Sequence, residues 1–170
     1  MKKIILLFGA VCILAFTTSC GYKFSMGGNL PLGITKVSVG IFQNNSSETG
    51  AEDSFTTAFI DELVKTTNAD IVDQNDADVS IKGYIDSITF GTLTRASNDS
   101  VNSIRVSAIV DLKIIDRTGK VIWSVHNFSD YEDYSFANTN TLDQAARRKA
   151  IEKIAERIAE KIVGRIRDNF

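Results

Sequence analysis

Hydrophobic and polar residues alternate most regularly in the middle of the chain, between Asn102 and Asp116. One set of alternate positions is apolar throughout: Ile104, Val106, Ala108, Val110, Leu112 and Ile114. Successive side chains of a β-strand point to opposite faces of a sheet, so this period of two predicts a strand with one buried face. The segment Asp116–Gly119 has a glycine where a tight turn favours a positive φ, and it predicts a hairpin into a strand from Lys120 to about Phe128.

Two earlier segments show the same alternation. In Lys36–Phe42 the apolar residues that share one face are Val37, Val39 and Ile41. In Val79–Thr92 the alternation changes phase, because Ile85 is followed by Ile88 and Phe90. A change of phase within one strand predicts a β-bulge near Asp86-Ser87. Ile71-Val72 is a further short apolar segment, and it suits a short edge strand.

Two segments have helical spacing. Apolar residues recur along one face from Ala51 to Thr67, and Thr49 and Glu52 have the spacing of a capping box at its start. A second helix is expected to begin at Thr141, which forms the same motif with Gln144.

The second helix has a continuous apolar row with a four-residue period: Leu142, Ala146, Ala150, Ile154, Ile158, Ile162, Ile166 and Phe170. A helix turns once in about 3.6 residues, so such a row drifts by roughly 40° per repeat and winds around the helix. The row therefore needs a twisted sheet, or a second partner, to cover its full length. On the polar side, Lys153 with Glu156 and Arg157 with Glu160 are expected to pair as neighbours three residues apart.

The order of these elements is β-α-β-β-β-α, and the strands alternate strongly. Such an order predicts an α+β fold, with one four-stranded sheet and two helices packed on its apolar face.

The N-terminal segment has a different pattern. Lys2 and Lys3 precede an apolar run from Ile4 to Phe16, and small polar residues follow up to Cys20. A basic start, a short apolar core and small residues are typical of a secretory signal peptide. The cysteine directly after them favours a lipoprotein signal, which predicts a signal peptide over residues 1–19, an acylated Cys20 and a single domain over 20–170. The alternative is a plain secretory signal in which Cys20 is incidental.

Charge and cysteine content exclude several classes of function. The chain has 19 Lys and Arg against 21 Asp and Glu, and cleavage would remove Lys2 and Lys3. This acidic balance argues against binding of nucleic acid through bulk charge. Cys12 would be discarded and Cys20 lipidated, which leaves no cysteine for a disulfide, a metal or a nucleophile.

Other candidate chemistry is sparse. His126 is the only histidine, so a Ser/His/Asp hydrolase would have to use it, although it lies in a predicted strand. Asp130, Glu132 and Asp133 lack the spacing and the glycine of a calcium loop, and we interpret them as a solvated rim.

Four segments carry a resemblance to a known family: Cys20–Phe24, Val37–Asn44, Ala77–Ile85 and Ala150–Ala159. Their sequences, order and spacing resemble LptE, the family of lipopolysaccharide-assembly lipoproteins. The resemblance implies a lipid-anchored outer-membrane protein that plugs an LptD-type barrel, supports the assembly of that barrel and helps lipopolysaccharide reach the cell surface. It implies no enzyme activity and no cofactor.

The resemblance also implies contact with lipopolysaccharide through basic residues on exposed loops. Arg95 lies in the matching loop between the second and third strands, whereas the loop Ser135–Thr141 has no Lys or Arg. Two other functions stay open: a periplasmic lipoprotein that activates or scaffolds another envelope complex, and a hydrolase that depends on His126.

Overall fold

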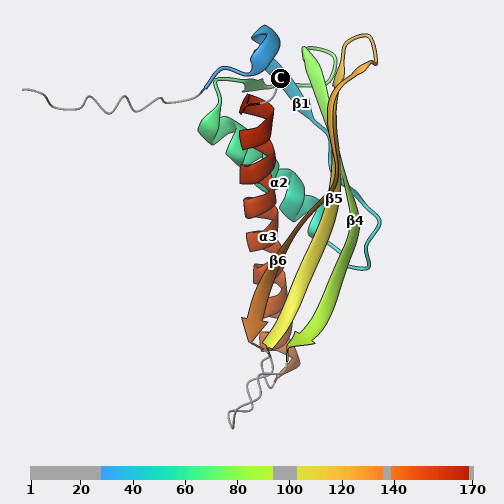
Figure 1. The fold of residues 1–170 in the computed structure, drawn as a ribbon, viewed down its shortest axis with the longest axis vertical. Helices are drawn as coiled ribbons and strands as arrows, with labels where there is room; N and C mark the ends of the chain where they lie inside the picture. The colour runs from blue at the N-terminus through green and yellow to red at the C-terminus, as the bar shows by residue number, and fades with distance from the viewer. Residues whose placement is uncertain (1–27, 94–102, 136–138, 169–170) are drawn as a thin grey trace, which may run out of the picture.

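The computed structural model describes residues 28–93, 103–135 and 139–168. Cys20, the expected signal peptide and Arg95 lie outside these residues. The described part is a mixed α+β fold in which two helices pack against one sheet (Figure 1). The sheet has six strands, so the expectation of four was wrong, although the fold class was correct.

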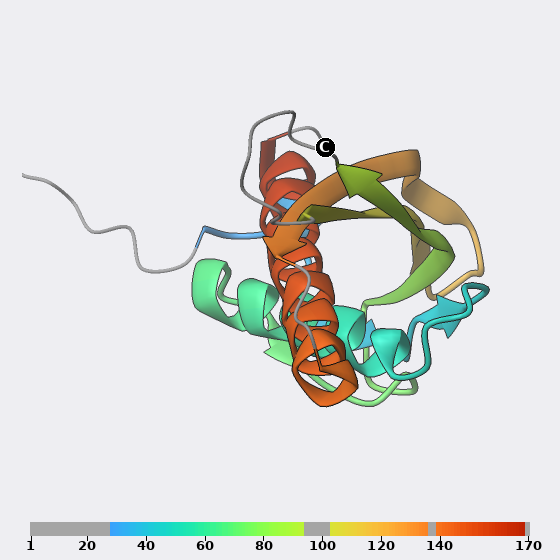
Figure 2. The same ribbon diagram turned by 90° about the horizontal axis from the view of Figure 1, so that it is seen from below.

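The elements follow one another as η1 (Pro31–Gly33), β1 (Lys36–Val39), β2 (Gln43–Asn44), α2 (Ala51–Thr66), β3 (Asp70–Ile71), β4 (Val79–Leu93), β5 (Ser103–Asp116), β6 (Val121–Ser135) and α3 (Asn140–Asp168). The strand order is β3-β1-β4-β5-β6, and β2 also pairs with β4. The short strands β1 and β2 run parallel to β4, while β4, β5 and β6 form an antiparallel meander. Figure 2 shows that these strands curve, with both helices on the concave side.

The first predicted strand is divided in two. Val39 pairs with Ile81, but Gln43 pairs with Tyr84, so this segment carries one more residue than β4 between the two pairs. The extra residue reverses the alternation. As a result Phe42 is buried at 3% exposure, whereas Ile41 is 74% exposed and does not share the buried face that its spacing predicted.

The long strands agree better with the sequence. The pairing of β4 with β5 shifts between Ile85 and Ser87, which confirms the predicted bulge. The alternate apolar side chains of β5 are buried from Val106 to Ile114. Strand β6, however, continues to Ser135, well past the expected end near Phe128.

Both predicted capping boxes were wrong. Helix α2 begins at Ala51 as expected, but its N-cap is Gly50 in a left-handed conformation with φ 86°. Glu52 does not cap the helix through Thr49; its carboxylate accepts a hydrogen bond from Asn44 Nδ2 at 2.7 Å. Helix α3 begins at Asn140, so Thr141 is already within it.

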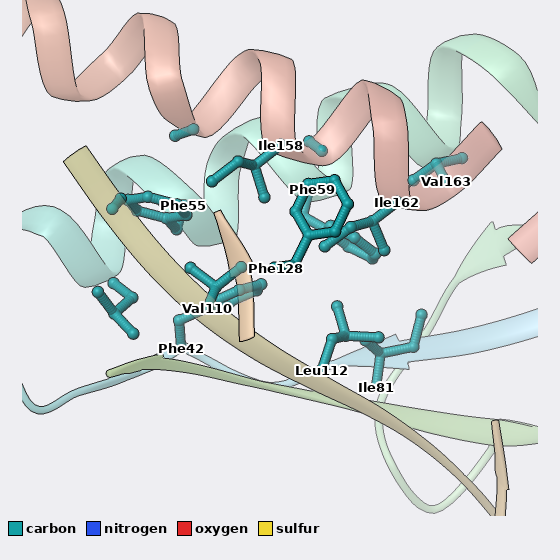
Figure 3. Close-up of a cluster of buried hydrophobic side chains, with 14 of the residues drawn as sticks. Phe42, Phe55, Phe59, Ile81, Val110, Leu112, Phe128, Ile158, Ile162 and Val163 are labelled. Atoms are coloured by element: carbon teal, nitrogen blue, oxygen red, sulfur yellow. The ribbon is translucent and has the colours of Figure 1, made fainter. Parts of the chain in front are cut away.

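The core lies between the sheet and the two helices (Figure 3). Phe42 contacts Phe55 and Phe59 of α2, with ring centroids 6.1 Å and 5.9 Å apart. The apolar rows of α3 are buried from Ala150 to Ile166, but Leu142 at the start of the main row is 62% exposed. The row therefore leaves the core at the N-terminal end of α3, as its winding predicted. Neither described helix is both long and apolar enough to cross a membrane.

Candidate functional site

The predicted site residue Arg95 lies outside the described residues, but the strands on either side of its loop are described. Leu93, the last residue of β4, pairs with Ser103, the first residue of β5, and Ser103 also pairs with Ser135 at the end of β6. The 94–102 and 136–138 segments are therefore attached to one end of the sheet, which we call the loop end. Gly28, the first described residue, bridges to Thr67 at the opposite end of the molecule (Figure 1).

A first cluster, made of Arg105, Asp133 and Tyr131, lies on the convex face of the sheet near the loop end. Arg105 of β5 donates hydrogen bonds to both carboxylate oxygens of Asp133 on β6, at 2.7 and 2.8 Å. Its guanidinium also stacks 4.0 Å from the centre of the Tyr131 ring. The hydrogen bond to Asp133 raises the pKa of Arg105. The planar fork of this arginine is thus already occupied by a carboxylate.

A second cluster, made of Arg147, Phe90 and Glu48, lies on the concave face. Arg147, in the second turn of α3, stacks 3.8 Å from the centre of the Phe90 ring on β4. Its guanidinium also forms an ion pair with Glu48, which precedes α2. These contacts fix the start of α3 against both the sheet and the loop before α2.

A groove of about 580 Å³ lies beside this second cluster. Its lining includes Glu48, Gly50 and Arg147, together with Arg148 on the exposed side of α3. Within the described residues Arg148 has no hydrogen bond or ion pair, in contrast to Arg105 and Arg147. Arg148 is therefore a cation near the loop end that the described part of the fold leaves available to a ligand.

Sequence reasoning did not identify Arg147 and Arg148 as site candidates. They are separated by many residues from the Arg95 loop, and only the strand pairing shows that the start of α3 and that loop belong to the same end. The useful signal would have been the pair of basic residues in the first turns of a helix, where the helix dipole gives cations no stabilisation.

A larger charged network joins α3 to β6. We call it the α3–β6 seam, and its members are Asp130, Glu132, Lys153, Arg157 and Lys161. Arg157 donates to Glu132 at 2.6 Å and to Asp130 at 3.4 Å. Lys161 donates to Asp130 at 2.6 Å, and Lys153 donates to Glu132 at 3.0 Å.

The seam lowers the pKa of both carboxylates. Burial acts to raise the pKa of Asp130, but hydrogen bonds from Lys161 and the Tyr131 backbone and the charge of Arg157 outweigh burial. For Glu132 the hydrogen bond from Arg157 is the main cause of the lowered pKa, and Lys153 adds to it. Both carboxyl groups are therefore more acidic in the folded chain than usual. At neutral pH they are ionised, and the ion pairs of the seam hold α3 against β6.

Two expectations about this region were wrong. Asp130 does not form a solvated rim, since its side chain is only 9% exposed. Lys153 and Arg157 pair with β6, not with the helix neighbours Glu156 and Glu160. No group of His, Cys, Asp or Glu side chains in the described part of the chain is arranged to hold a metal ion.

His126 lies on the exposed face of the sheet. Its Nδ1 is 2.6 Å from Asp111 Oδ2, and the backbone N–H of Asn127 donates to Asp111 Oδ1 at 2.8 Å. Asn127 has a positive φ of 51°, and the pairing of β5 with β6 shifts just there, between Val110 and Leu112. Asp111 thus anchors a bulge, and among the described residues no hydroxyl hydrogen bonds to His126.

The chain matches the model of a known family. The model of the family LptE, described as lipopolysaccharide-assembly, matches residues 34–166. This range includes every described strand and almost all of α2 and α3. Among curated proteins, no sequence matches the chain.

Solved structures share the fold at low sequence identity. A protein from Caulobacter crescentus CB15 is 14% identical, with a TM-score of 0.53 over 75% of this chain and 88% of its own. Lipoprotein B from Nitrosomonas europaea is 12% identical, with a TM-score of 0.52 over 84% of this chain and 87% of its own. The hypothetical protein CT253 from Chlamydia trachomatis is 11% identical, with a TM-score of 0.50 over 80% and 99%. At these identities the likeness concerns the fold alone.

Proposed function

The chain belongs to the LptE family of lipopolysaccharide assembly, and from that premise we propose that it plugs an LptD-type barrel in the outer membrane, helps that barrel assemble and assists lipopolysaccharide transport through it. The observation that carries the proposal is the family match over residues 34–166. The proposed role is that of a structural subunit, anchored by lipid at Cys20.

The dimensions of the fold support a plug. Strand β4 has 15 residues, and at about 3.4 Å per residue it is about 50 Å long. Helix α3 has 29 residues, which corresponds to about 44 Å. A bilayer with its headgroups is about 40–45 Å thick. The described part of the chain is thus long enough to occupy a membrane-embedded lumen from one side to the other.

The positions of the proposed anchor and the loop end support one orientation. Gly28 follows Cys20 by eight positions, and an extended chain reaches about 3.3–3.6 Å per residue, so the anchor lies within about 29 Å of Gly28. Gly28 and the loop end lie at opposite ends of the molecule (Figure 1). With the lipid in the periplasmic leaflet, the loop end would therefore point into the barrel and toward the cell surface.

Co-purification tests the plug. The full chain, extracted from outer membranes through a C-terminal tag, is expected to bring down the LptD-type barrel in equal amount. Isolation with a different envelope complex and no barrel would contradict the proposal and favour the activator or scaffold function.

Within this function we propose that Arg95 contacts lipopolysaccharide. Lipid A carries phosphates, and a guanidinium binds phosphate through two parallel hydrogen bonds. The loop of Arg95 is attached to the end of the sheet where Arg148 also lies without a described partner. The ordinary alternative is a solvated loop arginine with no ligand.

Arg95→Glu is expected to weaken lipopolysaccharide binding and make the outer membrane leakier, because it reverses the charge that meets the phosphate. Melting temperature and co-purification with the barrel should stay as in the unchanged chain. Lys82→Glu is the matched control, since Lys82 is exposed on β4 away from the loop end and has no side-chain partner among the described residues. Unchanged lipopolysaccharide binding by Arg95→Glu would remove Arg95 from the site and leave the plug in place.

A further inference from the structure

Strand β4 has one edge that is only partly covered. On one side it pairs with β5 over its whole length, from Val79 to Leu93. On the other side it pairs with β1 and β2, and the last of these pairs is Asn44 with Ile85. Asn44 Oδ1 then accepts the Ser46 N–H at 2.9 Å, and the chain turns away. From Ser87 to Leu93 no described strand pairs with this edge, which forms the outer border of the long strands in Figure 1.

The backbone groups that face the open edge follow from the register. The carbonyls of Ile81 and Ile85 accept hydrogen bonds from Gly40 and Asn45, so alternate residues from 81 to 85 point toward β1 and β2. The bulge between Ile85 and Ser87 moves this alternation by one residue. Ile88, Phe90 and Thr92 therefore direct their N–H and C=O groups away from β5, to the open edge.

The opposite border of the sheet is protected. Strand β6 carries Asp130, Glu132 and Asp133 along the corresponding half, and Arg157 donates a hydrogen bond to the Tyr131 carbonyl. Charged residues and covering side chains are the usual means of blocking an edge strand. The open part of β4, Ser-Ile-Thr-Phe-Gly-Thr-Leu, has no charge and no proline. The β6 border is thus blocked from pairing with a further strand, whereas the open edge of β4 can still pair with one.

We infer that the open edge of β4, from Ser87 to Leu93, binds an extended segment of the barrel partner as an additional strand of the sheet. The inference rests on the proposed function for the identity of the partner. Such a segment would continue the row that β1 and β2 already occupy on this edge. Backbone hydrogen bonds would supply affinity, and side-chain pockets beside the edge would supply specificity.

The neighbouring groove indicates the side chains that this segment carries. Phe90 stacks under Arg147, and Arg147 and Arg148 line the groove of about 580 Å³ beside it. Glu48 neutralises Arg147, whereas Arg148 has no partner in the described part of the chain. The added strand is therefore expected to place an acidic side chain over the groove and uncharged residues along the edge.

Amide hydrogen exchange at single-residue resolution tests this, with the full chain alone and in its purified complex with the LptD-type barrel. The amides of Ile88, Phe90 and Thr92 are expected to exchange about tenfold or more slowly in the complex than in the free chain. The amides of Thr89 and Gly91, which face β5, are internal controls and should be slow in both.

A pair of variants tests the same edge by affinity. Thr92→Pro removes one outward N–H at a position where an edge strand tolerates proline, and it is expected to bind the barrel about tenfold more weakly. Thr92→Ala keeps the N–H and should bind as the unchanged chain does.

The outcomes separate this inference from the proposed function. A complex that forms without slower exchange at Ile88, Phe90 and Thr92 would overturn the added strand and leave the plug standing. Absence of any complex would overturn both. Slower exchange that develops in the isolated chain as its concentration rises would assign the edge to a second copy, which also overturns the inference.

Discussion

At the scale of single residues, the ring of Phe42 packs directly over the backbone of Gly83. A Cβ added at Gly83 would lie 2.2 Å from Phe42 Cε1. Phe42 is buried between the sheet and α2, where it contacts Phe55 and Phe59. The ring is thus enclosed by Gly83 on the sheet side and by Phe55 and Phe59 on the helix side.

Gly83→Ala is expected to lower the free energy of unfolding by about 1–3 kcal/mol through overpacking. Gly91→Ala, on the same strand, is the matched control, because a Cβ there meets nothing within 4 Å. Its effect should be about 0.5 kcal/mol or less. Urea denaturation of both variants provides the measurement, and equal stabilities would contradict the close contact.

Single residues also determine where a helix begins, and both capping motifs in the sequence predicted this incorrectly. Thr49 with Glu52 and Thr141 with Gln144 both have the capping-box spacing. Glu52 is held instead by Asn44, a residue whose position depends on the pairing of β2 with β4. Helix α3 starts at Asn140, two residues before Leu142, which an N-cap at Thr141 requires as the first helical residue. A local motif could not reveal either fact, because long-range contacts decide which donor each side chain meets.

At the scale of elements, the four-residue row of α3 was the most reliable signal. From Ala150 to Ile166 every member of the row is buried, and Ile158 is only 2% exposed. Ile158→Asp would place a carboxylate without a partner in this core.

The cost of burying that charge is several kcal/mol, against a total stability of about 5–15 kcal/mol. The Ile158→Asp domain is therefore expected to unfold or nearly so, as followed by circular dichroism during thermal melting. Glu156→Asp, on the exposed side of the same helix, should melt like the unchanged chain. A normal melt for both would show that the row does not face the core.

The α3–β6 seam makes stability depend on pH. The pKa values of Asp130 and Glu132 are lowered in the folded chain, chiefly by Lys161 and Arg157 against the effect of burial. As pH falls, these two carboxylates therefore bind protons at higher pH in the unfolded chain than in the folded chain. The stabilisation is complete above the ordinary carboxylate pKa values of about 4 and is lost as pH falls through the lower values of the folded chain.

Arg157→Met should therefore reduce stability at pH 7 by about 1–2 kcal/mol and also make the loss of stability in acid shallower. Lys149→Met is the control, since the described structure gives Lys149 no partner. Urea melts at pH 7 and at low pH supply the comparison. If Arg157→Met leaves the loss of stability in acid unchanged, other carboxylates cause that loss.

Periodicity predicted the long elements correctly because their apolar faces repeat over many residues. It correctly placed β5, the bulge in β4 and the buried side of α3. It failed where one residue is added, as between β1 and β2, and where tertiary contacts extend an element, as in the second half of β6. There Asp130 and Glu132 face the helix, and the cations of α3 neutralise them.

At the scale of the whole molecule, the fold has two ends of different character. One end brings together Gly28, Thr67 and the C-terminal part of α3. The other carries the last residues of β4, to which the 94–102 segment is attached, and the start of α3 (Figure 1). The proposed function uses this polarity, since a lipid anchor at one end would present the other to the interior of the barrel. The sequence offered the loop of Arg95 as a candidate site, which stays a prediction, whereas Arg147 and Arg148 became candidates only through the strand pairing.

The anchor itself gives the last prediction. Cleavage before Cys20 and acylation of that residue would attach the chain within about 29 Å of Gly28, because an extended chain spans about 3.3–3.6 Å per residue. A single acyl chain binds membranes only marginally, at about 10⁴ M⁻¹, so stable anchoring requires more than one.

Mass spectrometry of the mature protein is expected to show an N-terminal Cys20 that carries several acyl chains. Cys20→Ser should remain unprocessed and lose stable attachment to the outer membrane. Cys12→Ser is the matched control, since Cys12 would leave with the signal peptide, and it should be lipidated normally. An unmodified Cys20, or a mature chain that begins elsewhere, would contradict the anchor and with it the orientation proposed for the loop end.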